Sequence, residues 1–202
     1  SQIHKKNIQV SFVPIEKLNK LTKNNHQGIV ATISPISTLD INGLEGKLKN
    51  TKSLLILVLD GITDTKNFGA IIRSAECFDV DLIIIPKTGS SPINGETIKS
   101  SSGAIFNVPI CKVNHIKDAI FLLKENEINL IGTSDKGFSS LYEHKFNSRT
   151  AIIIGSEGQG VNKSVLKLCD QVVNIVMQGK ISSLNVSVAT GIFLSEFRRQ
   201  LN

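Results

Sequence analysis

From residue 54 onwards, short apolar runs alternate with amphipathic stretches, and this alternation limits the possible folds more than any other feature. The runs cover residues 54–59, 82–85, 129–131 and 151–154. They are rich in β-branched residues and bounded by Gly, Pro or Asp, which is typical of strands buried in a parallel sheet. The intervening stretches have apolar side chains at helical spacing, and they cover residues 68–78, 116–125 and 163–169. Because such an alternation forms a parallel sheet flanked by helices, the sequence predicts an α/β fold.

A last helix is predicted over residues 184–199, and its apolar residues lie on two sides. One side holds Leu184, Val188 and Ile192, and the other holds Val186, Ala189, Phe193 and Phe197. A helix of this kind is buried on more than one side. We therefore expect one side to pack on the sheet and the other to meet a second copy of the protein or the N-terminal segment.

The front of the chain differs from the rest in charge and composition. Residues 1–53 hold eight lysines and three acidic residues, and so carry five of the six net positive charges. Such asymmetry fits either a surface that binds a polyanion such as a nucleic acid or a solvated lysine-rich surface. Glycines and a proline among lysines indicate a linker over residues 35–53, before a main domain at 54–202. Residues 1–34 are too few to fold alone, so they are a fragment of a larger module or pack on the main domain.

Several classes of protein are disfavoured. No apolar run approaches the roughly 18 residues of a membrane helix, and the first residues lack the apolar core of a signal peptide, so we expect a cytoplasmic protein. Cys77, Cys111 and Cys169 are scattered and odd in number, so reduced thiols and no metal site are expected. The turn after the first strand lacks GxGxxG and a P-loop lysine, which argues against an ordinary dinucleotide site.

A first candidate motif opens the first predicted helix. Asn67 is a suitable N-cap, and Gly69 leaves room for the side chain of Arg73 to lean towards the helix N-terminus. Since a helix N-terminus favours anions, this corner suits a phosphate. The alternative is that Arg73 pairs with Glu76 or Asp79.

Two further motifs lie late in the chain, which indicates a C-terminal ligand site. Residues 155–160 read Gly-Ser-Glu-Gly-Gln-Gly after a buried strand, so backbone groups and Glu157 could contact a ligand there, although a plain turn remains an alternative. Ser183, Asn185 and Ser187 crowd the start of the last helix. Helix capping explains one of these three side chains, and either a bound polar group or chance explains the others.

The three motifs read NxGxxxR, GxExxG and SLNVSVATG, and in this order they resemble the SpoU–TrmH family of the SPOUT superfamily over residues 54–200. The resemblance is closest to the branch that methylates a guanosine ribose in large-subunit ribosomal RNA. Residues 26–29 look like the tail of that branch's substrate-binding domain, which resembles a ribosomal protein of the L30e type. The resemblance therefore implies that this chain begins partway through an RNA-recruiting domain.

The same resemblance implies a trefoil-knotted C-terminal segment that binds S-adenosylmethionine, and a homodimer without a metal. The cofactor residues it implies are Thr133, Gly155, Glu157, Ile175, Met177 and Leu184. Val176 is a departure, because relatives commonly carry proline at this position, so the loop is expected to be less rigid.

The resemblance also implies catalytic roles in 2′-O-methylation of RNA. Arg73 is the central residue, and we expect it to hold an RNA phosphate and stabilise charge on the oxygen, with a base role left open. Ser183 and Asn185 would position the ribose and Arg73, and Asn67 and Glu157 would support the site. Three alternatives remain: methylation of transfer RNA, a non-catalytic RNA-binding or ribosome-assembly homologue, and a small-molecule enzyme using another nucleotide.

Overall fold

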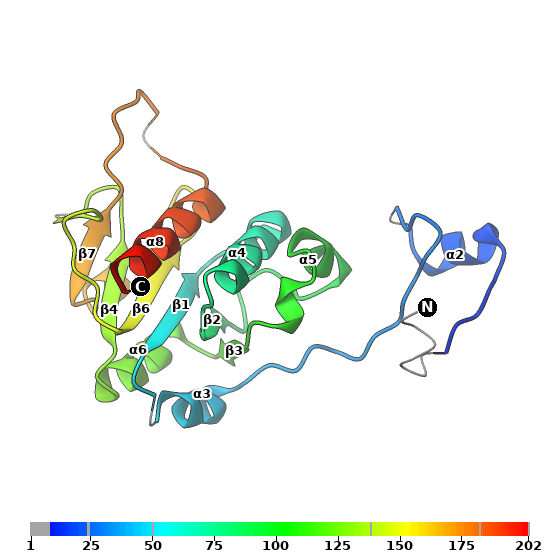
Figure 1. Cartoon of the computed structure of the whole chain (residues 1–202), viewed down its shortest axis with the longest axis horizontal. Coiled ribbons are helices and arrows are strands. Elements are labelled where there is room, and N and C mark those ends of the chain that lie inside the picture. Colours follow the sequence, from blue (N-terminus) through cyan, green and yellow to red (C-terminus); the bar gives the residue numbers. More distant parts are fainter. Residues whose placement is uncertain (1–8, 24, 50, 138, 182, 202) are drawn as a thin grey trace. The chain divides into compact units, whose positions relative to one another are not determined.

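A parallel β-sheet organises the larger of two units in the chain (Figure 1). The structure is a computed structural model that describes residues 9–23, 25–49, 51–137, 139–181 and 183–201. Along the chain, the smaller unit ends at Pro35 and the larger unit begins at Ile36. The predicted α/β class with a parallel sheet is confirmed in the larger unit.

In the described part of the chain the sheet has seven strands, in the order β3-β2-β1-β6-β4-β7-β5, and every neighbouring pair is parallel. The strands are β1 (Leu54–Asp60), β2 (Leu82–Pro86), β3 (Ile110–Val113), β4 (Asn129–Thr133), β5 (Ser139–Ser140), β6 (Arg149–Gly155) and β7 (Gln171–Asn174). The four predicted strands correspond to β1, β2, β4 and β6. The sequence pattern missed β3, β5 and β7, because these strands are short and carry polar residues.

Helices cover both faces of the sheet. They are α3 (Ile41–Leu48), α4 (Thr65–Cys77), α5 (Gly95–Ser100), the 3-10 turn η1 (Ala104–Phe106), α6 (Ile116–Glu125), α7 (Lys163–Leu166) and α8 (Val186–Leu201). Side chains of α4, η1 and α8 share one apolar core with the sheet, and side chains of α3, α6 and α7 share the other. The predicted helices at 68–78, 116–125 and 184–199 are confirmed as α4, α6 and α8, whereas α7 is shorter than the predicted 163–169.

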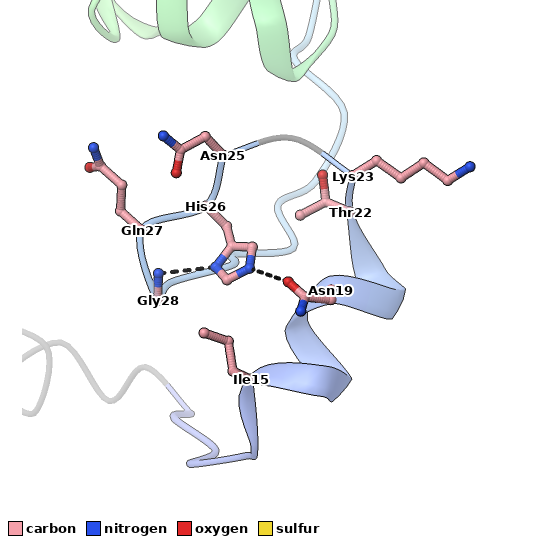
Figure 2. A pocket seen from close by; sticks show the side chains of 8 residues that line it. All are labelled: Ile15, Asn19, Thr22, Lys23, Asn25, His26, Gln27 and Gly28. Atoms are coloured by element: carbon pink, nitrogen blue, oxygen red, sulfur yellow. Dashed lines mark hydrogen bonds between the residues drawn. The ribbon is translucent and has the colours of Figure 1, made fainter.

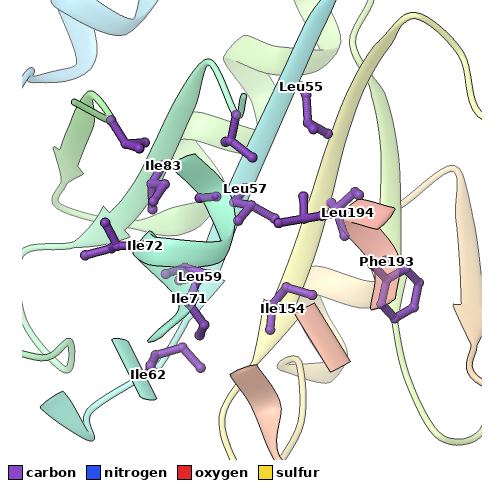
Figure 3. Packing of buried hydrophobic residues seen from close by; sticks show 14 of the residues in the cluster. Leu55, Leu57, Leu59, Ile62, Ile71, Ile72, Ile83, Ile154, Phe193 and Leu194 are labelled. Carbon is purple, nitrogen blue, oxygen red and sulfur yellow. The ribbon is translucent and has the colours of Figure 1, made fainter. Parts of the chain in front are cut away.

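The core under α4 and α8 fixes how these two helices lie on the sheet. Alternate residues of β1 and β6 meet isoleucines of α4 and the aromatic and leucine side chains of α8 (Figure 3). Leu57, Ile71, Ile154, Phe193 and Leu194 are each at most 2% exposed. Because each such side chain contributes roughly 1.5–3 kcal/mol when fully buried, this core holds α4 and α8 firmly in place.

Residues 35–53 are expected to form a linker, but residues 36–49 and 51–53 belong to the larger unit, and α3 packs on one of its two apolar cores. Asp40 caps α3 by accepting a hydrogen bond from Gly43 N at 2.9 Å, and Leu44 and Leu48 are 0% and 1% exposed. Leu39 forms a parallel bridge with Cys111 of β3. The leucines at helical spacing are the physical reason, since they find an apolar surface beneath α3 despite the glycines and lysines around them.

Arg149 at the start of β6 fastens this segment to the sheet, and replacing it is expected to loosen the segment. Its guanidinium donates to Leu48 O at 3.1 Å and Asn126 O at 3.0 Å, and also to Thr51 O. Arg149→Met keeps much of the side-chain length but leaves these carbonyls without the donor, so we expect a loss of about 2 kcal/mol in the free energy of unfolding. Urea denaturation measures the loss, with Lys117→Met, at an exposed position of α6, as the control. An unchanged midpoint for Arg149→Met would contradict the role.

The smaller unit, residues 1–35, contains α2 (Ile15–Leu21) and has no buried side chain among its described residues. Phe12 is 97% exposed and Ile29 is 78% exposed. A core is therefore absent from the part of this unit that the structure describes.

Candidate functional site

The three sequence motifs meet at the carboxyl edge of the sheet. Gly155 ends β6 and lies in register with Asp60, which ends β1. Helix α4 begins five residues after Asp60, at Thr65. Because the carboxyl ends of parallel strands share one edge, and ligands of open α/β sheets bind there, the topology places the motifs where a ligand site is expected.

One side chain from each motif joins an amide–carboxylate cluster, made of Asn67, Glu157 and Asn185. Asn67 Nδ2 donates to Glu157 Oε1 at 2.9 Å, and Asn185 Nδ2 donates to the same oxygen at 2.9 Å. Asn185 Nδ2 also donates to Asn67 Oδ1 at 3.0 Å. These bonds join residues 90, 28 and 118 positions apart in the chain. The structure therefore brings together three of the five predicted catalytic residues through direct contacts.

The N-termini of α4 and α8 orient the two amide side chains of the cluster. Asp64 is the N-cap of α4 and accepts from Asn67 N at 2.7 Å, so the prediction of Asn67 as the cap was wrong by three residues. This leaves the Asn67 side chain free to reach Glu157. At α8, Asn185 Oδ1 accepts from Ser187 N at 2.9 Å and from Ser187 Oγ at 2.6 Å. Because its oxygen caps the helix, the Asn185 amide nitrogen faces the other two members of the cluster.

Arg73 lies exposed on α4, about 9 Å along the helix axis from Asn67. Neither Glu76 nor Asp79 pairs with it. Glu76 Oε1 accepts from Asn107 Nδ2 at 3.2 Å, and Asp79 Oδ2 lies 3.7 Å from Arg198 Nη2. No hydrogen bond or ion pair of Arg73 occurs among the residues that the structure describes, so its guanidinium can bind an external anion.

Gly69 has a different role from the one expected. A Cβ at this position would lie 1.9 Å from Ser100 Oγ and 2.9 Å from the Ser100 backbone carbon. The missing side chain therefore allows α5 to approach α4, rather than leaving room for Arg73.

The predicted cofactor residues follow three neighbouring strands. Thr133 ends β4, Gly155 ends β6 and Ile175 follows β7, and β4 lies between the other two. Thr133 Oγ1 donates to Ile153 O at 2.9 Å, which ties the end of β4 to β6. A Cβ on Gly155 would lie 2.0 Å from Gly160 C, so this glycine lets the motif loop fold back against its own strand. Sheet order thus gathers these three positions at one edge.

The loop before α8 carries the remaining predicted residues. Met177 is half-buried, and Ser183 is exposed and lies outside the amide–carboxylate cluster. Leu184 is 38% exposed and precedes the capping residue Asn185. The structure therefore does not join Ser183 to the cluster.

Sequence reasoning missed Asp60 and Asp64, which shape the site from the loop after β1. Asp60 Oδ2 accepts from Asn162 N at 2.8 Å and so fastens the end of the second motif loop to β1. The sequence did contain a signal for both residues. Asp60 stands at the end of a predicted strand and Asp64 shortly before a predicted helix, in the turn that lacks the usual glycine pattern.

Two surface hollows are lined by other residues. One, of about 760 Å³, is in the smaller unit, where His26 Nε2 lies 2.9 Å from Asn19 Oδ1 and Gly28 N donates to His26 Nδ1 at 3.0 Å (Figure 2). The other, of about 360 Å³, is lined by Lys124, Glu127, Ile128, Asn129, Asn147 and Asp170. Neither is lined by a predicted site residue.

The described ranges also show where metal-binding residue types lie, and where a buried and a half-buried thiol lie. No group of three or more His, Cys, Asp or Glu side chains there could hold a metal ion. Burial is the main cause that raises the pKa of both Cys111 and Cys169 to about 11, which keeps these thiols protonated. No helix within the described ranges is long and apolar enough to cross a membrane.

Comparisons with known proteins agree with this geometry. Residues 54–195 match the SpoU rRNA Methylase family, and residues 1–39 match the RNA 2′-O ribose methyltransferase substrate binding family. The chain is 39% identical to the 23S rRNA (guanosine-2′-O-)-methyltransferase RlmB of Vibrio vulnificus, over 96% of this chain and 81% of that protein. It is 38% identical to the RlmB of Escherichia coli K12, over 87% of this chain and 72% of that protein.

Solved structures are similar as well. The SpoU methyltransferase AviRb of Streptomyces viridochromogenes, in complex with AdoMet, matches with a TM-score of 0.73 and 26% identity, over 82% of this chain and 66% of that one. The TrmH/SpoU tRNA modifying enzyme of A. aeolicus matches with a TM-score of 0.68 and 28% identity, over 79% of this chain and 81% of that one. With its three motifs gathered at one sheet edge and a family match over residues 54–195, the chain belongs to the SpoU rRNA methylase family.

Proposed function

We propose that this chain transfers a methyl group from S-adenosylmethionine to the ribose 2′-hydroxyl of a guanosine in large-subunit ribosomal RNA. The observation that carries the proposal is the amide–carboxylate cluster, which joins all three motifs at the ligand-binding edge of the sheet. The two RlmB relatives, at 38% and 39% identity, support the substrate and the reaction.

The carboxyl edge of β6, β4 and β7 suits the cofactor. S-adenosylmethionine supplies an electrophilic methyl group on a positively charged sulfur. Gly155, Ile175 and Leu184 would hold it through backbone groups, with Thr133 and Met177 beside them. Glu157 suits a cationic ligand, because its hydrogen-bond partners in the described part of the chain are two neutral amides. The trefoil knot that the family resemblance implies at these loops stays a prediction.

The remaining residues would align the RNA. Arg73 would hold a phosphate next to the target ribose and stabilise negative charge on the 2′-oxygen. Ser183 and Asn185 would position the ribose, and Asn67 would keep Glu157 in place. Because binding already holds the hydroxyl in line with the methyl group, less entropy is lost on the way to the transition state. The activation barrier for methyl transfer is therefore lower. The lysine-rich residues 1–53 would add non-specific attraction for RNA, and the site of action that we propose is the cytoplasm.

The proposed assembly is a homodimer formed through the outward side of α8. Val188 is 52% exposed and Ile181 in the preceding loop is 78% exposed, although the opposite side of α8 is buried. Apolar side chains grouped at one end of a helix favour association with a second copy.

A charged side chain on the outward side of α8 is expected to dissociate the dimer into monomers. Val188→Lys places a cation at the interface, so sedimentation velocity should show a monomer where the unchanged protein sediments as a dimer. Phe121→Lys is the matched control, because Phe121 is also exposed, at 51%, but lies on α6 on the other face of the sheet. A Val188→Lys variant that stays dimeric would place the interface elsewhere.

Methyl transfer itself tests the proposed function. The protein is incubated with methyl-labelled S-adenosylmethionine and either deproteinised large-subunit ribosomal RNA or transfer RNA, and the labelled nucleosides are identified after digestion. We expect 2′-O-methylguanosine in the ribosomal RNA. Label in transfer RNA alone would favour the activity of the A. aeolicus relative, and absence of label from both would reject the proposal.

A further inference from the structure

We infer that Lys66 and Lys99, two residues outside the three motifs, bind backbone phosphates of the RNA strand that flanks the target ribose. Together with Arg73 they form a basic surface where α5 packs against α4. The inference rests on the proposed function and deepens it, because it assigns a sequence-independent RNA contact to residues for which neither the motifs nor the relatives' names give a role.

Two of the three cations of the basic surface lie on one side of α4. Lys66 and Arg73 are both exposed and are seven residues apart, which is two helical turns or about 10 Å along the helix axis. Lys66 also directly precedes Asn67, a member of the amide–carboxylate cluster. An RNA strand whose ribose lies at the cluster can therefore contact both cations.

Contacts between α4 and α5 bring Lys99 to the same surface (Figure 1). Ser100 Oγ donates to Thr65 O at 3.2 Å, and a Cβ on Gly69 would lie 1.9 Å from Ser100 Oγ. Since Lys99 directly precedes Ser100, its backbone lies beside the first two turns of α4. The Lys99 side chain is exposed, so its ammonium group is available to a ligand on the outer surface of the two helices.

The lysines of the basic surface have no partner of opposite charge. Lys66 and Lys99 form no ion pair and no side-chain hydrogen bond within the ranges that the structure describes. By contrast, Lys124 on α6, across the sheet, lies 3.5 Å from Asp170 Oδ1. Unpaired cations grouped beside a ligand site favour a polyanion, because each phosphate that they neutralise releases condensed counterions.

One nearby carboxylate, Glu96, opposes this attraction. It is exposed in the first turn of α5, three residues before Lys99, and so lies on the same side of that helix. Glu96 forms no ion pair with another described residue. Its charge would repel an RNA backbone on the basic surface, so removing it should have an effect opposite in sign to the removal of a lysine.

Alanine substitutions measure the two phosphate contacts. Lys66→Ala and Lys99→Ala should each raise the dissociation constant for deproteinised large-subunit ribosomal RNA by about fourfold near physiological salt. The slope of log affinity against log salt should become shallower by about 0.7 in each variant, because one phosphate fewer is neutralised. Filter binding over a range of potassium chloride concentrations measures both quantities. Calorimetric titration should show an unchanged dissociation constant for S-adenosylmethionine.

Three further variants separate an electrostatic contact from damage to the fold. Lys99→Arg keeps the charge and should keep the salt slope. Lys117→Ala removes a positive charge from an exposed position of α6 and should change neither the RNA affinity nor the slope. Glu96→Gln removes a negative charge and should lower the dissociation constant for RNA by about twofold. A damaged fold would weaken RNA binding and could not produce this gain.

Unchanged RNA affinity and salt slope in both alanine variants would overturn the inference, and so would weaker RNA binding by Glu96→Gln. A salt slope that Lys117→Ala lowers as much as Lys99→Ala does would also overturn it, since the contact would then not be specific to the basic surface. Failure of the proposed function gives a different result, because RNA binding is measured without methyl transfer and the unchanged protein itself would then leave the RNA unlabelled.

Discussion

Replacing Arg73 with alanine is expected to lower methyl transfer to RNA by about 10³-fold, since removal of a single donor that stabilises a developing oxyanion typically costs 10²–10³-fold. Arg73 is exposed on α4 and makes no hydrogen bond or ion pair with the described residues. The fold and the affinity for S-adenosylmethionine should therefore stay nearly unchanged. Single-turnover kinetics measures the first effect, and calorimetric titration with the cofactor measures the second.

Two further variants serve as comparisons for Arg73→Ala. Arg73→Lys keeps the charge but not the planar fork that binds phosphate through two parallel bonds, so it should recover only part of the rate. Lys117→Ala removes a positive charge from an exposed position of α6 and should have little effect. Methylation retained by Arg73→Ala would reject the assignment of this residue.

Gly155→Ala is expected to disrupt the second motif loop and abolish cofactor binding. The added Cβ would lie 2.0 Å from both Gly160 C and Val161 N, which are backbone atoms that cannot rotate away. The bridge between Ser156 and Gly160 would have to open, and Glu157 would move with the loop. Overpacking of this kind costs roughly 3 kcal/mol of stability. Urea denaturation and cofactor titration measure the two losses.

Gly46→Ala is the control for this substitution. Gly46 lies in α3, and a Cβ there would meet nothing within 4 Å. Since alanine favours a helix over glycine by roughly 0.5–1 kcal/mol, this variant should be as stable as the unchanged protein or slightly more stable. If Gly155→Ala binds the cofactor with unchanged affinity, then the backbone of the second motif loop is not part of the binding site.

The central strands could be predicted because burial on both faces demands continuous apolar sequence. β1 and β6 lie in the middle of the sheet, and their residues are apolar almost throughout. Towards this end of the sheet the strands are less buried, so the edge strand β5 consists of two serines, and its neighbour β7 begins and ends with polar residues. Local pattern therefore carries information about the centre of a sheet and little about its edges.

The candidate site was predictable as a set of residues but not as an arrangement. Motif spacing and family resemblance identified Asn67, Glu157 and Asn185. Neither indicated that two amides share one carboxylate oxygen, or that Asp64 and not Asn67 caps α4. A cap depends on where the chain turns into the helix, and that depends on how α4 docks on the sheet.

The sequence by itself determined the class of fold, the helices that carry the motifs and the residue types available for chemistry, because these depend on the periodicity and chemistry of neighbouring residues. Only the tertiary structure decided the strand order, the docking of α3 in the expected linker and the sharing of one Glu157 oxygen by two amides. Those features arise from contacts between residues distant in the chain, which form only when the two apolar cores close around the sheet.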